Sequence, residues 1–464
     1  MADGQALAEY AVALAERRGF GYGEAYFEQS SGTGYAIEQG RLNSSSYFEK
    51  SGLRIRLLKE GRMYVFSTNI LEKDAIRNAI EGFRRFESSR TQLSRESPQK
   101  AKVAVKERKK FDKERLLKDL LSLDKTLASK RYIKFRSLYA GFGKDSSFMT
   151  NSDGSSILQE TPRVDSTFSI IVGKGKETRQ RMSQFGGVGG YEMLNIQRIE
   201  EQLLGDSKAM LDVIEKGVRL SDPELRKIEN VLISPEIAGI AVHESVGHPN
   251  EADRVFMREA AQAGTSYVNP DNLGLSIGSE HVTIIDDPTI PNSFGFYRYD
   301  DEGVKARAKQ IVSRGKQNEL LNNREYAKIL KTKSNGSARS DSYSNEPIVR
   351  MSNTYLKKGS ASFEELVGEA GNGVYIKNFM EWNIDDTRTF SRYQGNEAYM
   401  IKNGSVEKPI KNYRLETKTL DFWHAVALLG KDFELSLGNC GKGEPMQGVP
   451  VTMGGPHALL CFGR

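Results

Sequence analysis

The spacing of hydrophobic residues predicts alternating helices and antiparallel strands in the first half of the chain. Hydrophobic and polar residues alternate, with glycines at the turns, in residues 22–67 and 133–173, which predicts hairpin strands. Helical spacing appears in four further segments: residues 3–18, 71–86, 112–128 and 197–217. This half is therefore expected to combine an antiparallel sheet with flanking helices.

The pattern changes around residues 221–223, Ser-Asp-Pro, and we place a domain boundary there. Residues 231–234, Val-Leu-Ile-Ser, are typical of a short buried strand, and they lead directly into a helix start. Ser234 is a good N-cap, Pro235 suits the first helical position, and Glu236 places an acid in the first turn. The remaining sequence is richer in short strands than in helices. We predict an α+β protein with an N-terminal α/β domain (1–222) and a C-terminal β-rich domain (223–464).

Composition and length favour a folded protein with more than one hydrophobic core. The chain has 464 residues, of which 38% are hydrophobic, and this length favours two domains. The formal net charge is +6, but residues 100–119 alone contain nine basic and four acidic residues, a net charge of +5. That segment has one aromatic residue, and its acids would repel phosphate, so we interpret it as a solvated connector and helix start. A nucleic-acid-binding arm is the alternative.

Cysteine usage and hydrophobicity also bear on the compartment. Two cysteines in 464 residues do not make a disulfide scaffold. The first 20 residues lack a basic segment followed by an apolar one, and no run of 18 apolar residues is present. We therefore expect a cytoplasmic protein without a membrane partner.

A candidate metal site follows the predicted helix start. His243-Glu244-Ser-Val-Gly-His248 places two imidazoles five residues apart, with a carboxylate beside the first. A regular α-helix would separate these histidines by about 140°. A π-type turn brings positions i and i+5 onto one face, and we predict one here, with Gly247 accommodating the distorted backbone and Pro249 ending the helix. Two unrelated histidines are the alternative.

The motif does not by itself identify the third metal ligand. Cys440 lies between glycines, and Lys442 nearby would favour the thiolate. A His₂Cys set leaves one zinc position for water, whereas a fourth protein ligand would make the site structural. We favour the catalytic form because Glu244 has no role in a closed site. The candidates, besides carboxylates, are Cys440, Cys461, His281, His424 and His457.

Two other acidic groups are weaker candidates. Glu251 and Asp253 lie one turn beyond the second histidine, and they would either orient the imidazoles or simply be solvated. The acidic run at 300–302 favours a turn or salt-bridge role over catalysis.

An ordered series of motifs runs through nearly the whole sequence. In the first half these are Asn151-Ser-Asp-Gly154 and Gly186-Gly-Val-Gly-Gly-Tyr-Glu192. In the second half they are His243-Glu-Ser-Val-Gly-His-Pro-Asn-Glu-Ala-Asp253, Asp286-Asp-Pro288, Asp300-Asp-Glu-Gly303, Asn335-Gly336, Pro347-Ile-Val-Arg-Met-Ser-Asn-Thr-Tyr355, Glu397-Ala-Tyr399 and Gly438-Asn-Cys-Gly-Lys442. In this series the sequence resembles the TldD half of the TldD/TldE (PmbA) metallopeptidases, and the HExxxH distinguishes the TldD from the TldE half.

The resemblance implies a cytoplasmic zinc (Zn²⁺) peptidase in which His243, His248 and Cys440 are the ligands and Glu244 is the general base. It also implies a heterodimer with a TldE/PmbA-like subunit and unfolded peptide substrates that enter an internal channel. Two positions depart from the family pattern: Ser337-Ala-Arg339 replaces an Arg pair that often follows Asn-Gly, and Cys461 lies in an unusual tail. No role carries over to Cys461.

Our hypothesis is therefore a zinc-dependent peptidase that cleaves unfolded peptides or small proteins by Glu244-assisted attack of zinc-bound water. It would act in a TldD/TldE-type heterodimer. The alternative is a zinc-stabilised interaction protein that binds nucleic acid, or an enzyme acting on nucleic acid, through residues 100–119. The presence of Glu244 and the neutralising acids of the basic segment favour the peptidase.

Overall fold

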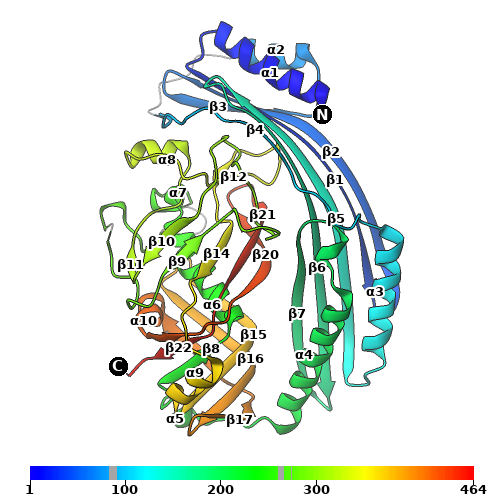
Figure 1. Cartoon of the computed structure of the whole chain (residues 1–464), viewed down its shortest axis with the longest axis vertical. Helices are drawn as coiled ribbons and strands as arrows, with labels where there is room; N and C mark the ends of the chain where they lie inside the picture. The colour runs from blue at the N-terminus through cyan, green and yellow to red at the C-terminus, as the bar shows by residue number, and fades with distance from the viewer. Residues whose placement is uncertain (83–90, 260–265, 273, 464) are drawn as a thin grey trace.

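A long curved sheet forms most of the first half of the chain and arches beside the second half (Figure 1). The computed structural model describes residues 1–82, 91–259, 266–272 and 274–463. The strand order is β3–β2–β1–β5–β6–β4, with β7 also paired to β6, and among the described strands of this sheet only the β4–β6 pair is parallel. The strands are β1 (Tyr22–Glu38), β2 (Arg41–Lys59), β3 (Arg62–Thr68), β4 (Lys100–Ala104), β5 (Ile133–Asn151), β6 (Ser156–Lys174) and β7 (Glu177–Val188).

Helices cover this sheet at two places and create two cores. Helices α1 (Ala2–Arg17) and α2 (Lys73–Glu81) pack Leu7 and Ile76 against Phe27 and Ile55 of the strands. Helices α3 (Lys113–Ala128) and α4 (Ile196–Lys216) contribute leucines to a second core around Phe168. Burial of these apolar faces holds the helices to the sheet.

The second half contains two larger sheets with helix α6 (Pro235–Val242) between them (Figure 1). One sheet has the order β11–β10–β9–β14–β21–β20, and its strands are β9 (Ile284–Asp286), β10 (Lys309–Ser313), β11 (Lys316–Gln317), β14 (Asn353–Leu356), β20 (Glu434–Lys442) and β21 (Gln447–Gly455). The other has the order β17–β16–β15–β8–β22–β19 with β18 beside β16, and its strands are β8 (Asn230–Ile233), β15 (Gly373–Ile384), β16 (Phe390–Lys402), β17 (Ser405–Ile410), β18 (Arg414–Lys418), β19 (Val426–Leu429) and β22 (Ala458–Cys461).

The smaller elements lie around these sheets. Strands β12 (Ala338–Arg339) and β13 (Ile348–Val349) pair with each other. The short helices are α5 (Asp222–Leu225), α7 (Ala252–Val255), α8 (Arg324–Ile329), α9 (Phe363–Ala370) and α10 (Thr419–His424). Because α6 contacts β14, β20 and β21 as well as β15, it is buried on nearly all sides, which explains why its sequence is apolar apart from Glu236 in the first turn.

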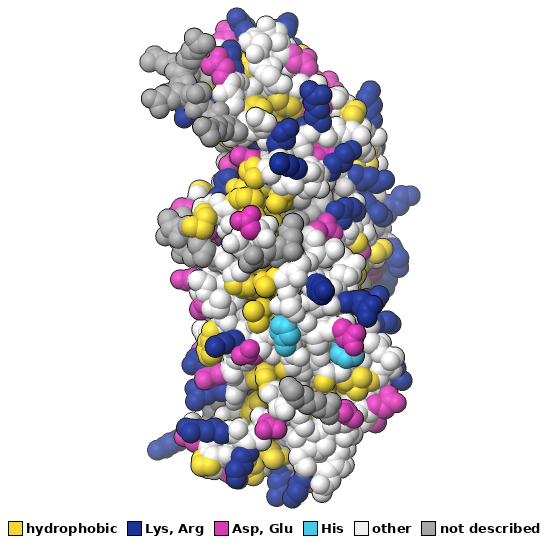
Figure 2. Space-filling view, turned by 90° about the vertical axis from the view of Figure 1, so that its left-hand side faces the viewer, with side chains coloured by type: hydrophobic (Ala, Val, Ile, Leu, Met, Phe, Trp, Pro, Cys, Tyr) yellow, Lys and Arg dark blue, Asp and Glu magenta, His cyan; other side chains and the backbone are white. Residues whose placement is uncertain are grey.

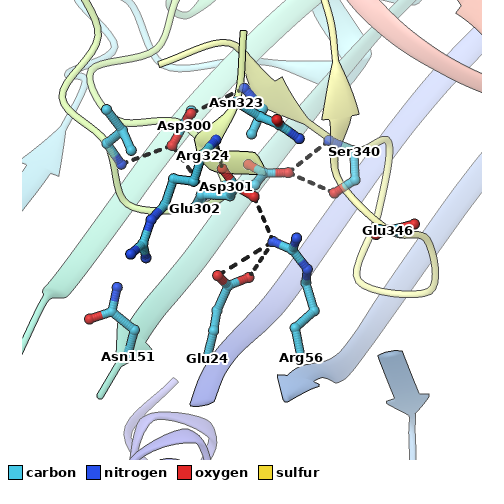
Figure 3. Close-up of polar contacts among 12 residues, drawn as sticks. Glu24, Arg56, Asn151, Asp300, Asp301, Glu302, Asn323, Arg324, Ser340 and Glu346 are labelled. Carbon is cyan, nitrogen blue, oxygen red and sulfur yellow. Dashed lines mark hydrogen bonds and ion pairs between the residues drawn. The ribbon is translucent and has the colours of Figure 1, made fainter. Parts of the chain in front are cut away.

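A buried ion-pair network joins the curved sheet to the second half (Figure 3). The Nη1 atom of Arg56 in β2 lies 3.2 Å from Glu24 Oε1 in β1 and 2.9 Å from Glu302 Oε1. The other Glu302 oxygen accepts a hydrogen bond from the backbone N–H of Arg324 at 2.8 Å. Burial and the nearby Glu302 carboxylate raise the pKa of Asp300 well above its ordinary value. The acidic run therefore serves in ion pairs and turns, as expected.

The predicted α+β class is confirmed, and so are the four helices, although residues 83–86 of the second one lie outside the described residues. Strand β7 lies beyond the predicted strand region, which ended at residue 173, and was not predicted. Residues 100–119 form β4, a loop and the start of α3, so the helix start is confirmed and the strand is an addition. The boundary at residue 222 remains a prediction.

The surface and the helices bear on two other expectations. None of the helices in the described part is long and apolar enough to cross a membrane. On the face in Figure 2, acidic side chains are interspersed among the basic ones. On this face, such mixing is unlike the continuous positive surface that usually follows a nucleic-acid backbone. No observation here supports the nucleic-acid alternative.

Candidate metal centre

The two histidines of the HExxxH motif face each other because the helix widens. Ser234 caps α6 by accepting a hydrogen bond from the backbone N–H of Ile237 at 3.4 Å. After Val242 the helix continues as a π-helical turn, His243–Gly247, and this confirms the predicted distortion. The rings of His243 and His248 lie edge to face with centroids 4.9 Å apart. In this widened turn, the five-residue spacing places both imidazoles on the same face of the helix.

Cys440 of β20 completes a cluster with them. One ligand atom from each of His243, His248 and Cys440 lies within 4.8 Å of the others, and Cys440 Sγ is 3.3 Å from His248 Nε2. All three residues are buried, at 3%, 4% and 6% exposure. Atoms bound to one tetrahedral zinc at about 2.0–2.3 Å lie roughly 3.5 Å apart, so only small shifts would be needed.

The charges of the cluster also suit a cation. Burial opposes ionisation of Cys440, but the two imidazoles lower the pKa of its thiol well below the ordinary value. Burial likewise opposes charging of His248, yet the Cys440 thiolate and Glu251 raise the pKa of its imidazole to about 10. His243 Nδ1 is buried and has no hydrogen-bond partner among the described residues. A thiolate and two imidazoles, one of which has an unpaired buried nitrogen, fit a zinc ion, whose binding displaces the protons.

A second layer of polar residues orients the ligands. Glu251 Oε2 accepts a hydrogen bond from His248 Nδ1 at 2.8 Å, which leaves Nε2 facing the cluster. Burial would raise the pKa of Glu251, but Lys442 and His248 hold it below its ordinary value. Lys442 lies 3.1 Å from Glu251 and 2.6 Å from Asp253. Of the two acids, Glu251 orients an imidazole and Asp253 pairs with the lysine instead.

Lys442 therefore does not act as the sequence suggested. Its ammonium pairs with carboxylates, and the lowered pKa of Cys440 comes from the imidazoles. Cys440 is supported by Arg350, which donates hydrogen bonds to the carbonyl oxygens of Cys440 and, at 2.8 Å, of Gln447. This contact ties β20 to the segment before β14 and had no specific sequence signal.

Glu244 directly follows His243 in the π-helical turn and has a basic partner. The residue is nearly buried, at 9% exposure, and Oε2 accepts a hydrogen bond from Arg388 Nη1 at 2.8 Å. Arg388 comes from the turn between β15 and β16, 144 residues away. Sequence reasoning missed it, because nothing in Asp-Asp-Thr-Arg-Thr (385–389) marks one residue as functional. The hydrogen bond from Arg388 thus fixes the position of the Glu244 carboxylate.

The other ligand candidates lie elsewhere in the described part of the chain. His457 bonds with Asp432 at 2.7 Å and His424 with Ser276 at 3.0 Å. Cys461 packs in a separate hydrophobic cluster around Leu366. A closed His₂Cys₂ site that includes Cys461 is therefore not formed.

Gly247 has a different role from the one predicted. Its φ of −59° is ordinary for a helix, so the distorted turn does not need a glycine for backbone reasons. A Cβ atom on Gly247 would lie 1.9 Å from Met351 Sδ. Glycine is required because the motif helix and the segment before β14 approach closely.

We expect Gly247→Ala to weaken zinc binding, because the added methyl group forces the turn away from Met351. Overpacking of this kind typically costs about 1–3 kcal/mol. Zinc affinity measured by competition with a chromogenic chelator checks this. Gly247→Ala combined with Met351→Ala should recover part of the loss. Gly205→Ala, in α4 with nothing near the added atom, is the control. Unchanged zinc affinity in Gly247→Ala would contradict the packing argument.

Comparisons with known proteins show which family this chain resembles. A family model described as PmbA/TldA metallopeptidase C-terminal domain matches residues 226–461, and one described as PmbA/TldA metallopeptidase domain 1 matches residues 23–84. A metalloprotease from Methanothermobacter thermautotrophicus is 38% identical over 320 residues, 68% of this chain and 66% of that relative. A metalloprotease from Archaeoglobus fulgidus is 30% identical over 437 residues, 91% and 94% of the two chains.

Two further likenesses extend the picture. A zinc metalloprotease TldD homolog from Saccharolobus solfataricus is 34% identical over 229 residues, 49% of each chain. The crystal structure of TldE from Thermococcus kodakarensis has the same fold, with a TM-score of 0.77 over 98% of each chain at 18% identity. Fold, cluster and relatives together define a metallopeptidase class. Within it, this chain belongs to the PmbA/TldA metallopeptidase family, which includes the TldD homologs, so the resemblance seen in the sequence is confirmed.

Proposed function

We propose that the chain is a zinc-dependent peptidase in which His243, His248 and Cys440 hold the metal. The observation that carries this proposal is the convergence of three buried ligand atoms within 4.8 Å. The nearly buried Glu244 directly follows one of these ligands in the π-helical turn. Zinc held by three protein ligands keeps a fourth position open and supplies Lewis acidity toward water or a peptide carbonyl. A closed structural site would have no use for Glu244.

Glu244 would provide the acid–base chemistry. Its Oε2 is held by Arg388, and Oε1 makes no hydrogen bond among the described residues. Oε1 can therefore accept a proton from the attacking water and later pass it to the departing amine of the cleaved peptide. Glu251 would keep His248 in the tautomer that presents Nε2 to the metal.

We infer that the substrates are unfolded peptides and that a TldE/PmbA-like subunit is the partner, in the cytoplasm. The ligands are at most 6% exposed, so a folded protein surface cannot reach them, whereas an extended chain is narrow enough. The likeness to TldE over 98% of both chains supports a partner of the same shape, because related folds commonly assemble around similar symmetric interfaces.

The test is cleavage of an unstructured peptide by the full chain, with and without a TldE-like partner. We expect cleavage that stops when a chelator removes the metal and returns when zinc alone is restored. Mass spectrometry of the products locates the cut bonds. A chain that binds one zinc ion yet cleaves nothing, alone or with the partner, would refute the proposal.

A further inference from the structure

The turn that carries Arg388 is held rigidly beside Glu244. Arg388 has a φ of 63°, which is uncommon for a residue with a long side chain. Such a conformation persists only where the surroundings fix it, and it is found most often at functional sites. The guanidinium makes its only described side-chain hydrogen bond to Glu244, and its Nε atom is buried without a partner.

Several contacts fix this turn from both sides. Thr419 Oγ1 donates a hydrogen bond to the carbonyl oxygen of Arg388 at 2.6 Å, and the Thr419 N–H donates to the carbonyl oxygen of Thr389 at 2.8 Å. Asp385 accepts hydrogen bonds from the N–H of Phe390 at 2.6 Å and from the hydroxyl of Thr389 at 2.8 Å. The turn is therefore a rigid support rather than a mobile cover.

The segment after the second histidine also contacts the turn. Arg254 Nη1 donates a hydrogen bond to the carbonyl oxygen of Asp386 at 3.2 Å. Arg254 lies in α7, six residues after His248, so the segment that follows the second ligand is tied to the turn that holds Arg388. Glu244 and Arg388 are thus fixed in one frame with the metal cluster.

We propose that Arg388 is a positioning residue for Glu244, and this inference rests on the proposed peptidase function. By binding Oε2 it fixes the rotation of the carboxylate, so that Oε1 faces the attacking water. A carboxylate left free to rotate would spend less time in the productive orientation, and a base oriented by a third group is a recurring arrangement in enzymes. Arg388 acts through Glu244 and does not itself contact the substrate.

The kinetic test uses Arg388→Ala and Arg388→Lys in the zinc-loaded protein with its partner. We expect Arg388→Ala to lower kcat by about 10- to 100-fold, as for other residues that orient catalytic groups, with KM changed less than about twofold. Arg388→Lys should recover part of kcat, because an ammonium can still donate to Oε2. In a Glu244→Gln background, Arg388→Ala should have less than about a twofold further effect.

Each contrary result identifies a different role. A rise in KM with kcat unchanged would make Arg388 a substrate-binding residue and overturn the proposal. A rise in kcat would make it an inhibitory contact, and an undiminished effect in the Glu244→Gln background would show that it acts independently of Glu244. Arg392→Ala is the matched control, because Arg392 lies on the same hairpin in a more exposed ion pair with Glu381.

A second measurement needs no activity. In metal-free protein, Arg388→Ala leaves the nearly buried Glu244 carboxylate unpaired and should lower the thermal midpoint by about 2 °C or more. The same substitution in the Glu244→Gln background should lower it by less than half as much. Equal shifts in both backgrounds would contradict the contact. An inactive parent would refute the proposed peptidase, while this thermal coupling would still report on Arg388 and Glu244.

Discussion

Glu244→Gln is expected to lower the rate of peptide cleavage by about 10²- to 10⁴-fold while leaving the zinc content unchanged. Glutamine has nearly the same shape, and its carbonyl oxygen can still accept the hydrogen bond from Arg388. It cannot accept a proton from water at neutral pH, so the acid–base function is lost while the site keeps its form. The measurements are kcat/KM on an unstructured peptide and metal content by elemental analysis.

Glu236→Gln is the matched control for this variant. Glu236 lies in the first turn of the same helix and pairs with Arg181 at 2.6 Å, away from the metal cluster. We expect its substitution to leave kcat/KM within a few-fold of the parent. Should Glu244→Gln cleave as fast as the parent, Glu244 would not be the base. Loss of zinc in Glu244→Gln would instead indicate a structural role for the carboxylate.

The main features of this site were open to prediction because they depend on local geometry. His243 and His248 are five residues apart, so they could not both bind one metal ion from a regular α-helix. The motif can therefore form a metal site only if the helix widens. The structure contains the widened turn. Hydrophobic periodicity likewise predicted the helices, since each buries one face against a sheet.

The supporting residues were not predictable in this way. Arg388, Arg350 and Lys442 act through partners between 90 and 191 residues distant, and their roles depend on how separate strands come together. Lys442 is an example. It lies two residues from Cys440 on the same strand, but its ammonium forms ion pairs with Glu251 and Asp253 instead. Sequence proximity suggested a contact that the fold does not make.

The network between the two halves was hidden for the same reason. Glu24 and Arg56 are single polar residues within alternating strands, which normally predicts exposure to water. Here the face that carries these two residues is covered by the second half of the chain, in which Glu302, 246 residues after Arg56 in the sequence, lies 2.9 Å from the Arg56 guanidinium. The alternation correctly predicted strands, and only the tertiary fold shows that these charges are buried.

Arg56→Met is expected to lower the free energy of unfolding by about 3–5 kcal/mol. Methionine preserves the length of the side chain but leaves two carboxylates, Glu24 and Glu302, each 1% exposed, without their shared cation. An isolated buried charge is far more costly than a lost surface pair. Urea unfolding of the parent and the variant, followed by tryptophan fluorescence and circular dichroism, measures the change.

Two further variants separate this cause from a simple loss of contacts. Arg56→Met combined with Glu24→Gln and Glu302→Gln should regain part of the lost stability, because neutral amides tolerate burial better than unpaired carboxylates. Arg314→Met is the control, because Arg314 pairs with Glu280 at 3.3 Å on the open surface, where we expect little change. If Arg56→Met lowered the free energy of unfolding no more than Arg314→Met, the buried network would not hold the curved sheet to the half of the chain that carries the candidate metal ligands.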